Sequence, residues 1–184
     1  MIVLVGKTAS GKTLIANEMM KRGYKKIVTT TTRPMRKKEF DGIDYDFISE
    51  DEFIEKTKNH YFLEFTSYKT TNGIWYYGTP LESVENAKDK SVVVLNPYGC
   101  KEILSLLPDK NITIFYIYAN NNTMKKRLLK RGDTKDEIER RIKADNEDFK
   151  GIELLVDRII YNNGNRKIGD VVDEIIRFTN NNKK

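Results

Sequence analysis

The stretch Ile2-Val-Leu-Val-Gly6-Lys7-Thr8-Ala9-Ser10-Gly11-Lys12-Thr13 decides the fold of this 184-residue chain. Its first four residues are apolar and predict a short buried strand, and the next eight satisfy the complete G-x-x-x-x-G-K-[ST] pattern of a phosphate-binding loop. Apolar residues from Leu14 to Met20 recur with helical spacing, so we expect the loop to lie between a strand and a helix, as its mechanism requires. A glycine-rich turn can match so short a pattern by chance, but chance rarely supplies both flanking elements.

Each position of this loop has a chemical task. The glycines let successive backbone N–H groups converge on phosphate oxygens, and the following helix adds the partial positive charge of its N-terminus. Lys12 can reach the β and γ phosphates, and Thr13 can bind Mg²⁺. We therefore predict binding of ATP, with GTP as the alternative, and we predict that Lys12 is also catalytic. The residues of this expected ATP site are Gly6, Lys7, Thr8, Ala9, Ser10, Gly11, Lys12 and Thr13.

Short apolar segments alternate with amphipathic ones along the rest of the chain, which is typical of a parallel α/β sheet. Two segments, Ser91 to Leu95 and Ile112 to Ile117, are nearly continuous in apolar and β-branched residues and predict central strands with both faces covered. We expect further strands at Ile27 to Thr30 and Ile159 to Tyr161, and a closing amphipathic helix at Ile168 to Phe178. The sequence thus predicts an α/β fold of three layers.

Two stretches interrupt this alternation. Residues 33–79 are rich in charged and aromatic side chains and include a predicted helix from Glu50 to Asn59, so they predict an inserted subdomain. Residues 124–149 are rich in arginine, with helical spacing on either side of Arg131-Gly132-Asp133, and predict a mobile helical lid. We therefore expect one domain over residues 1–184, in which residues 1–32, 80–123 and 150–184 form the core.

The composition sets outer limits on the function. A formal net charge of +6 suits any polyanionic partner, whether nucleotide or nucleic acid. No apolar run approaches the roughly 20 residues that span a bilayer, and Met1 to Val5 leave no room for a signal peptide before the loop, so we expect a cytoplasmic protein. With one cysteine, Cys100, and one histidine, His60, neither an internal disulfide nor a zinc cluster of soft ligands can form.

Downstream of the loop, several ordered motifs resemble the guanylate kinase family. They begin with Thr29-Thr-Thr-Thr-Arg33-Pro-Met-Arg36 and Glu39-Phe-Asp-Gly42-Ile-Asp-Tyr45-Asp-Phe47, and continue with Phe62-Leu63-Glu64, Tyr76-Tyr77-Gly78-Thr79 and the lid. The resemblance covers nearly the whole chain. It implies a P-loop NTPase fold and a nucleoside monophosphate kinase that uses Mg²⁺ and moves the γ-phosphoryl group of ATP to GMP or dGMP.

The resemblance also implies an acceptor site. Arg33, Arg36, Tyr45 and Tyr77 would hold the acceptor's phosphate, and Glu64 and Thr29 would read its base, with Thr79 beside them. The chemistry of these residues agrees, because forked guanidinium donors and phenolic hydroxyls suit a phosphate dianion. Guanine presents adjacent N1–H and N2–H₂ donors to a carboxylate, whereas adenine presents an acceptor at N1, so Glu64 favours guanine. Taken singly, each of these residues has an ordinary structural interpretation as a solvated charge, a buried aromatic or an ion-pair partner.

The lid arginines have a catalytic role by the same resemblance. Arg127 and Arg131 are four residues apart and share one face of a helix, where an anion would relieve their mutual repulsion. Together with Arg141, whose neighbour Arg140 is an alternative, they would close over the donor phosphates. Phosphoryl transfer requires this kind of charge neutralisation together with exclusion of water. The alternative is an ordinary basic helix surface.

Three features depart from the family pattern. Val94 and Asn96 stand where the family usually has two aspartates, and the segment from Phe65 to Tyr76 is longer than usual. The loss at Val94 leaves Mg²⁺ to Thr13, phosphates and water. Asn96 can still accept from the guanine N2 amino group, but without charge assistance. The alternatives are therefore a kinase of a modified nucleotide or of a nucleic-acid end, although nucleic acid is the less expected partner, and a phosphopeptide-binding module, against which the intact loop argues.

The loop assignment gives the first prediction. Lys12→Ala should lower phosphoryl transfer by about two orders of magnitude or more while the fold survives, because the lysine supplies charge to the phosphates rather than packing to the core. Steady-state rates and a thermal melt of the variant test this. Wild-type rates in the variant would remove Lys12 from the reaction.

Overall fold

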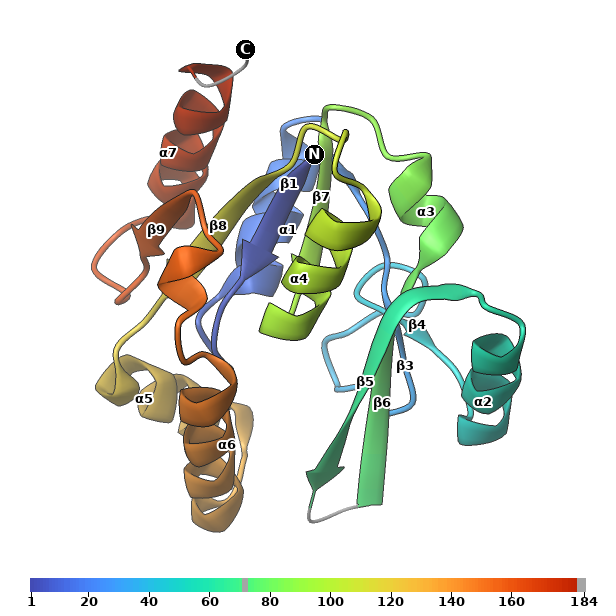
Figure 1. Cartoon of the computed structure of the whole chain (residues 1–184). Coiled ribbons are helices and arrows are strands. Elements are labelled where there is room, and N and C mark those ends of the chain that lie inside the picture. Colours follow the sequence, from blue (N-terminus) through green and yellow to red (C-terminus); the bar gives the residue numbers. More distant parts are fainter. Residues whose placement is uncertain (71–72, 182–184) are drawn as a thin grey trace.

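The computed structural model describes residues 1–70 and 73–181 and is built around a five-stranded parallel sheet (Figure 1). The strand order is β2-β7-β1-β8-β9, and every neighbouring pair is parallel. The central strand β1 is buried over its whole length. The strands are β1 (Ile2–Val5), β2 (Lys25–Lys26), β7 (Ser91–Leu95), β8 (Thr113–Tyr118) and β9 (Arg158–Tyr161).

Helices cover both faces of this sheet, because alternate residues of β1 point to opposite sides. Ile2 and Leu4 pack against α1 (Lys12–Lys21) and α7 (Ile168–Asn181), whereas Val3 and Val5 pack in the cluster that contains Cys100 of α4 (Pro97–Leu106). The short helix α3 (Leu81–Glu85) adds Val84 to this second cluster. The predicted α/β fold with three layers is confirmed, and among the described residues no helix is long and apolar enough to span a membrane.

A second, four-stranded sheet carries the insertion, in the order β4-β3-β6-β5. Its strands β5 (Phe62–Thr70) and β6 (Gly73–Pro80) form a long antiparallel hairpin that projects away from the core sheet (Figure 1). The remaining strands are short: β3 (Thr30–Thr31) and β4 (Asp46–Phe47). The predicted helix appears as α2 (Glu50–Lys58).

One predicted strand, Ile27 to Thr30, is wrong. The main sheet takes Lys25–Lys26 as β2, and the backbone N–H of Ile27 still donates to Val92 at 2.8 Å, but Thr30–Thr31 pair with β4 and β6 of the other sheet. The apolar pattern does not reveal this crossing because both Ile27 and Thr30 are buried. The chain therefore passes from one sheet to the other within the predicted strand.

The predicted lid forms two helices, α5 (Asn121–Arg131) and α6 (Lys135–Asp148). Gly132 ends α5 with a φ of 90°, in the left-handed region that glycine adopts readily, and the Thr134 side chain accepts from Glu137 N to start α6. A 3₁₀ turn, η1 (Ile152–Leu154), leads from α6 to β9. In Figure 1 the lid and the β5–β6 hairpin lie on either side of the space below the parallel strands.

The insertion depends on Phe53 of α2, which is 1% exposed and whose ring stacks on Phe62 with 4.5 Å between centroids. Phe53→Ala should therefore lower the free energy of unfolding by about 3 to 5 kcal/mol and weaken acceptor binding more than donor binding. Its neighbour Ile54, which is 40% exposed, is the matched control, and Ile54→Ala should cost less than about 1 kcal/mol. Urea unfolding measures both variants, and equal losses would mean that this ring stack does not anchor α2.

Candidate active site

The phosphate-binding loop connects β1 to α1, and neighbouring atoms lie so close to its two glycines that a side chain would not fit. A Cβ on Gly6 would lie 2.5 Å from the Ile117 carbonyl oxygen. Gly11 has a φ of 106°, and a Cβ there would lie 2.4 Å from Nδ2 of Asn162. Any larger residue at either position would displace the backbone of the loop or its neighbours.

The outer side of the loop is held by Arg127 and Asn162. Arg127 Nη1 donates to the carbonyl oxygens of Ala9 and Ser10, both at 3.0 Å, and its Nη2 donates to the Asn162 carbonyl at 3.0 Å. The buried Asn162 side chain donates to Ser10 O at 2.8 Å. These contacts satisfy the carbonyl groups of the loop. The structure thus engages Arg127 in supporting the loop, and its role over the donor phosphates stays a prediction.

Lys12 is folded back onto its own loop. Its Nζ donates to the carbonyl oxygens of Gly6, at 2.5 Å, and Lys7, at 3.0 Å. Burial lowers the pKa of Lys12 to about 8, which Asp145 opposes and Arg131 reinforces. The ammonium group is therefore weakly solvated, and a phosphate would stabilise its charged form.

A cavity of about 220 Å³ joins this loop to the insertion. The loop contributes Gly6, Thr8 and Lys12 to its wall, and α6 contributes Arg140, Arg141 and Asp145. Six of the predicted acceptor residues line the same cavity. These are Thr29, Tyr45, Glu64, Tyr77, Thr79 and Asn96.

The Glu64 carboxylate lies in this cavity with one oxygen unsatisfied. Thr79 Oγ1 donates to Glu64 Oε1 at 2.6 Å, whereas Oε2 is buried with no partner among the described residues. Burial raises the pKa of Glu64, an effect that the bond from Thr79 opposes. A ligand that donates N–H groups would both satisfy the free oxygen and favour the ionised form.

Asn96 is already engaged at the start of α4. Its Oδ1 accepts from Gly99 N at 2.7 Å, and its Nδ2 lies 3.5 Å from the Tyr68 hydroxyl. The oxygen predicted to accept from guanine therefore also serves as a helix cap. Tyr68, which the sequence analysis did not single out, lines the cavity from the long hairpin.

Arg33 and Arg36 meet at one carboxylate, Glu39, to which the sequence analysis assigned no role. Arg33 is 3% exposed and makes a forked ion pair with both oxygens of Glu39, each at 2.7 Å, while Arg36 donates its backbone N–H and Nη1 to it at 2.9 and 3.2 Å. Burial raises the pKa of Glu39, but the bonds from both arginines outweigh it and lower that pKa. Arg33 also lies 4.9 Å from the ring centre of Tyr45, so the predicted phosphate ligands are held together.

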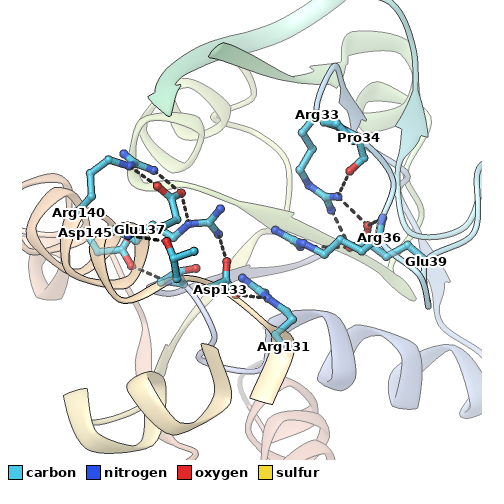
Figure 2. A network of polar contacts seen from close by, with 12 residues as sticks. Arg33, Pro34, Arg36, Glu39, Arg131, Asp133, Glu137, Arg140 and Asp145 are labelled. Atoms are coloured by element: carbon cyan, nitrogen blue, oxygen red, sulfur yellow. Dashed lines mark hydrogen bonds and ion pairs between the residues drawn. The ribbon is translucent and has the colours of Figure 1, made fainter. Parts of the chain in front are cut away.

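The remaining lid arginines are paired with acidic residues of the lid itself, and Figure 2 shows Arg36 extending from the Glu39 cluster toward Arg131. Arg131 pairs with Asp133 at 3.0 Å, and its charge lowers the pKa of Arg36, after burial as the main cause. Arg140 and Arg141 both pair with Glu137, at 2.8 and 2.6 Å, and the bond from Arg140 is the main reason that the pKa of Glu137 falls to about 2. Since both arginines line the cavity, the structure keeps both as candidates.

Asp145 is a further cavity residue that the sequence analysis missed. Its Oδ2 accepts from the backbone N–H of Thr8 at 2.6 Å, within the phosphate-binding loop. The sequence did contain a hint of this, because Asp145 follows Arg141 by four residues and the two therefore share one face of α6.

An intact phosphate loop that shares one cavity with a second cluster of cationic and phenolic groups defines a P-loop nucleoside monophosphate kinase. The family model described as guanylate kinase matches residues 1–179. The chain is 35% identical to the guanylate kinase of Sulfurimonas denitrificans, over 77% of this chain and 69% of that protein. It is 30% identical to the guanylate kinase of Clostridioides difficile, over 98% and 88% of the two chains. The chain therefore belongs to the guanylate kinase family.

Solved structures agree on the fold. The crystal structure of guanylate kinase from Anaplasma phagocytophilum matches with a TM-score of 0.71 and 23% identity, over 98% of this chain and 84% of that one. An uncharacterized protein from Eubacterium ventriosum matches with a TM-score of 0.55 and 17% identity, over 98% of each chain. At these identities the likeness shows the fold alone.

The contacts of Arg127 and Arg131 predict that the same substitution lowers stability at one position and activity at the other. Arg127→Met should lower the free energy of unfolding by about 1 to 3 kcal/mol, because it leaves loop carbonyl groups without donors. Arg131→Met should change it by less than about 0.5 kcal/mol, because only an exposed ion pair is lost, and should lower kcat instead. Urea unfolding and steady-state kinetics of both variants measure this. A stable Arg127→Met protein would refute the supporting role of Arg127.

Proposed function

We propose that this protein transfers the γ-phosphoryl group of ATP to GMP or dGMP, giving ADP and GDP or dGDP. The observation that carries the acceptor assignment is the buried Oε2 of Glu64, which has no partner in residues 1–70 and 73–181 and lies in the cavity that also contains Lys12. Guanine has two adjacent N–H donors for the two oxygens of a carboxylate. Adenine would place an acceptor against the same carboxylate and is disfavoured.

The acceptor's phosphate would bind between Arg36 and Arg131. These two guanidinium groups are close enough for the charge of one to lower the pKa of the other, so an anion between them relieves repulsion. Arg33 would hold Arg36 in position through Glu39, and Tyr45 and Tyr77, whose rings are in contact and line the cavity, would supply hydroxyl groups. Thr29 lies in the same cavity and would contact the nucleoside with Thr79.

The donor's phosphates would bind along residues 6–13, where the backbone N–H groups and Lys12 neutralise their charge. The lid would add the positive charges of Arg131, Arg140 and Arg141. Negative charge builds up on the phosphoryl group as it passes between the two substrates, and cationic groups placed at that point accelerate the transfer. Closure of the lid over the cavity would exclude water as a competing acceptor.

Mg²⁺ would enter this site bound to the phosphates of ATP rather than to a set of protein side chains. Among the described residues, no group of three or more His, Cys, Asp or Glu side chains could hold a metal. Thr13, at the start of α1, would supply one oxygen, and phosphates and water would supply the rest, as Mg²⁺ commonly requires. Bound in this way, the ion would neutralise the donor phosphates.

We also propose that the partners are the small nucleotides ATP and GMP or dGMP, without nucleic acid or membrane, and that the protein acts in the cytoplasm. A net charge of +6 suits nucleotide phosphates as well as a nucleic-acid surface, so the charge by itself does not require nucleic acid. Residues 33–79 would act as the acceptor-binding insertion and residues 124–149 as the lid of a single domain.

An ADP-release assay with Glu64→Gln tests this proposal. Wild type should prefer GMP and dGMP over IMP, AMP, CMP, UMP and oligonucleotide 5′ ends, and Glu64→Gln should lower kcat/KM for GMP by about tenfold to a hundredfold while leaving AMP unchanged. The amide keeps the shape of the side chain but places a donor against guanine. Equal losses with GMP and AMP, or a preference for oligonucleotide ends, would refute the acceptor assignment.

The pKa of Glu64 adds a pH dependence to this test. Because burial raises that pKa, the carboxyl group protonates at a higher pH than an exposed glutamate, and it then loses an acceptor oxygen for guanine. The GMP activity of wild type should therefore fall faster with decreasing pH than that of Glu64→Gln, which shares every other titrating group, including the GMP phosphate.

A further inference from the structure

The carboxylate of Asp145 occupies the phosphate-binding loop. Its Oδ2 accepts from the backbone N–H of Thr8 at 2.6 Å, and the side chain of the next residue, Asn146, accepts from Lys7 Nζ at 2.7 Å. Thr8 and Lys7 belong to the run of residues whose N–H groups and charges bind the phosphates of a nucleotide. The last turn of α6 is therefore bound to the loop by a hydrogen bond from a backbone N–H to an anionic oxygen, which is the bond that a phosphate oxygen would make.

The charges around Asp145 also resemble those around a phosphate. Asp145 and Lys12 line the same cavity, and the negative charge of Asp145 opposes the fall in the pKa of Lys12 that burial causes. Two other acidic groups of the lid, Asp133 and Glu137, pair with arginines, whereas Asp145 contacts the loop itself. Burial raises the pKa of Asp145, so its charge in this position is held at a cost that the loop N–H and Lys12 offset.

We propose that Asp145 is an internal competitor of the donor nucleotide, whose carboxylate binds the phosphate loop until ATP displaces it. Two anions cannot share one N–H donor at hydrogen-bond distance, so each molecule of ATP that binds must break the Asp145 contact. The inference rests on the donor site of the proposed function and adds a residue that sets its affinity.

Displacement of Asp145 has a consequence for the lid. Arg140 and Arg141 lie on α6 a turn before Asp145 and line the cavity with it. Release of Asp145 from Thr8 removes one of the two contacts that hold the end of α6 to the loop and leaves only the exposed bond from Lys7 to Asn146, so occupation of the loop by ATP is coupled to the position of these two arginines. The phosphates of ATP would thus replace the carboxylate of Asp145 at the loop. This replacement would move α6, which carries Arg140 and Arg141.

Calorimetric titration of ATP into the full chain tests this proposal, with and without Mg²⁺ and in the absence of GMP. Asp145→Asn keeps the shape of the side chain but removes the competing charge, and it should bind ATP about fivefold to tenfold more tightly than wild type under both conditions. Glu139→Gln is the matched control, because Glu139 is exposed on α6 and is not among the charges that shift the pKa of Asp145. It removes one negative charge from the same helix at an exposed position that does not touch the loop, and it should change ATP affinity by less than about twofold.

Two further titrations separate competition from other roles. Tripolyphosphate has no base or sugar and should show the same gain with Asp145→Asn, whereas GMP affinity should not change. Asp145→Ala, with no polar group at all, should also bind ATP more tightly than wild type, which keeps the test valid if the asparagine variant has a lower thermal midpoint.

The outcomes are distinct. Unchanged ATP affinity in both Asp145 variants would mean that the contact only fastens α6 and would overturn the proposal. Weaker ATP binding in the variants would overturn it as well, and a loss confined to the titration with Mg²⁺ would identify Asp145 as a group that helps to bind the metal-nucleotide complex. If wild type itself fails to bind ATP, the donor site of the proposed function fails first.

Discussion

The structure depends on hydrogen-bond donors for the carbonyl groups of the phosphate loop. A loop that turns its N–H groups toward a phosphate must turn its carbonyl groups away from it, and buried carbonyl groups need donors of their own. Arg127 from α5, Asn162 after β9 and Lys12 within the loop supply those donors. The loop therefore joins the core sheet and the lid before any nucleotide binds. Its shape depends on residues more than a hundred positions away in sequence.

A second feature is that the cationic groups of the cavity are held by internal carboxylates. Glu39 holds Arg33 and Arg36, and Glu137 holds Arg140 and Arg141. So many guanidinium groups without partners would repel one another and destabilise the folded chain. The ion pairs keep the donors in place, and Arg140 and Arg141 still line the cavity. Substrate phosphates then either compete with Glu39 and Glu137 for these arginine donors or bind beside them.

Local patterns predicted much of this fold, and distant contacts account for what they missed. The strand, loop and helix from Ile2 onward, and the Gly132 and Thr134 boundaries of the lid, follow from rules that act within a few residues. The split of Ile27 to Thr30 between two sheets depends on which strands each half meets, and apolar residues do not encode that choice. The function of Glu39 and the contact of Asp145 with Thr8 likewise depend on tertiary structure, although the motif residues around them were identifiable.

The departures at Val94 and Asn96 gain a physical interpretation from their surroundings. Val94 packs partly against the apolar cluster beneath the sheet, and Asn96 must supply an oxygen to cap α4, which asparagine and aspartate do about equally well. Asparagine keeps the cap without placing a second negative charge in the cavity that contains Glu64, whose pKa burial already raises. Asp145 supplies a carboxylate to the same cavity from α6, beside the phosphate loop. The carboxylate of Asp145 thus lies next to an N–H donor of the loop and near Lys12, which partly offset the cost of its burial.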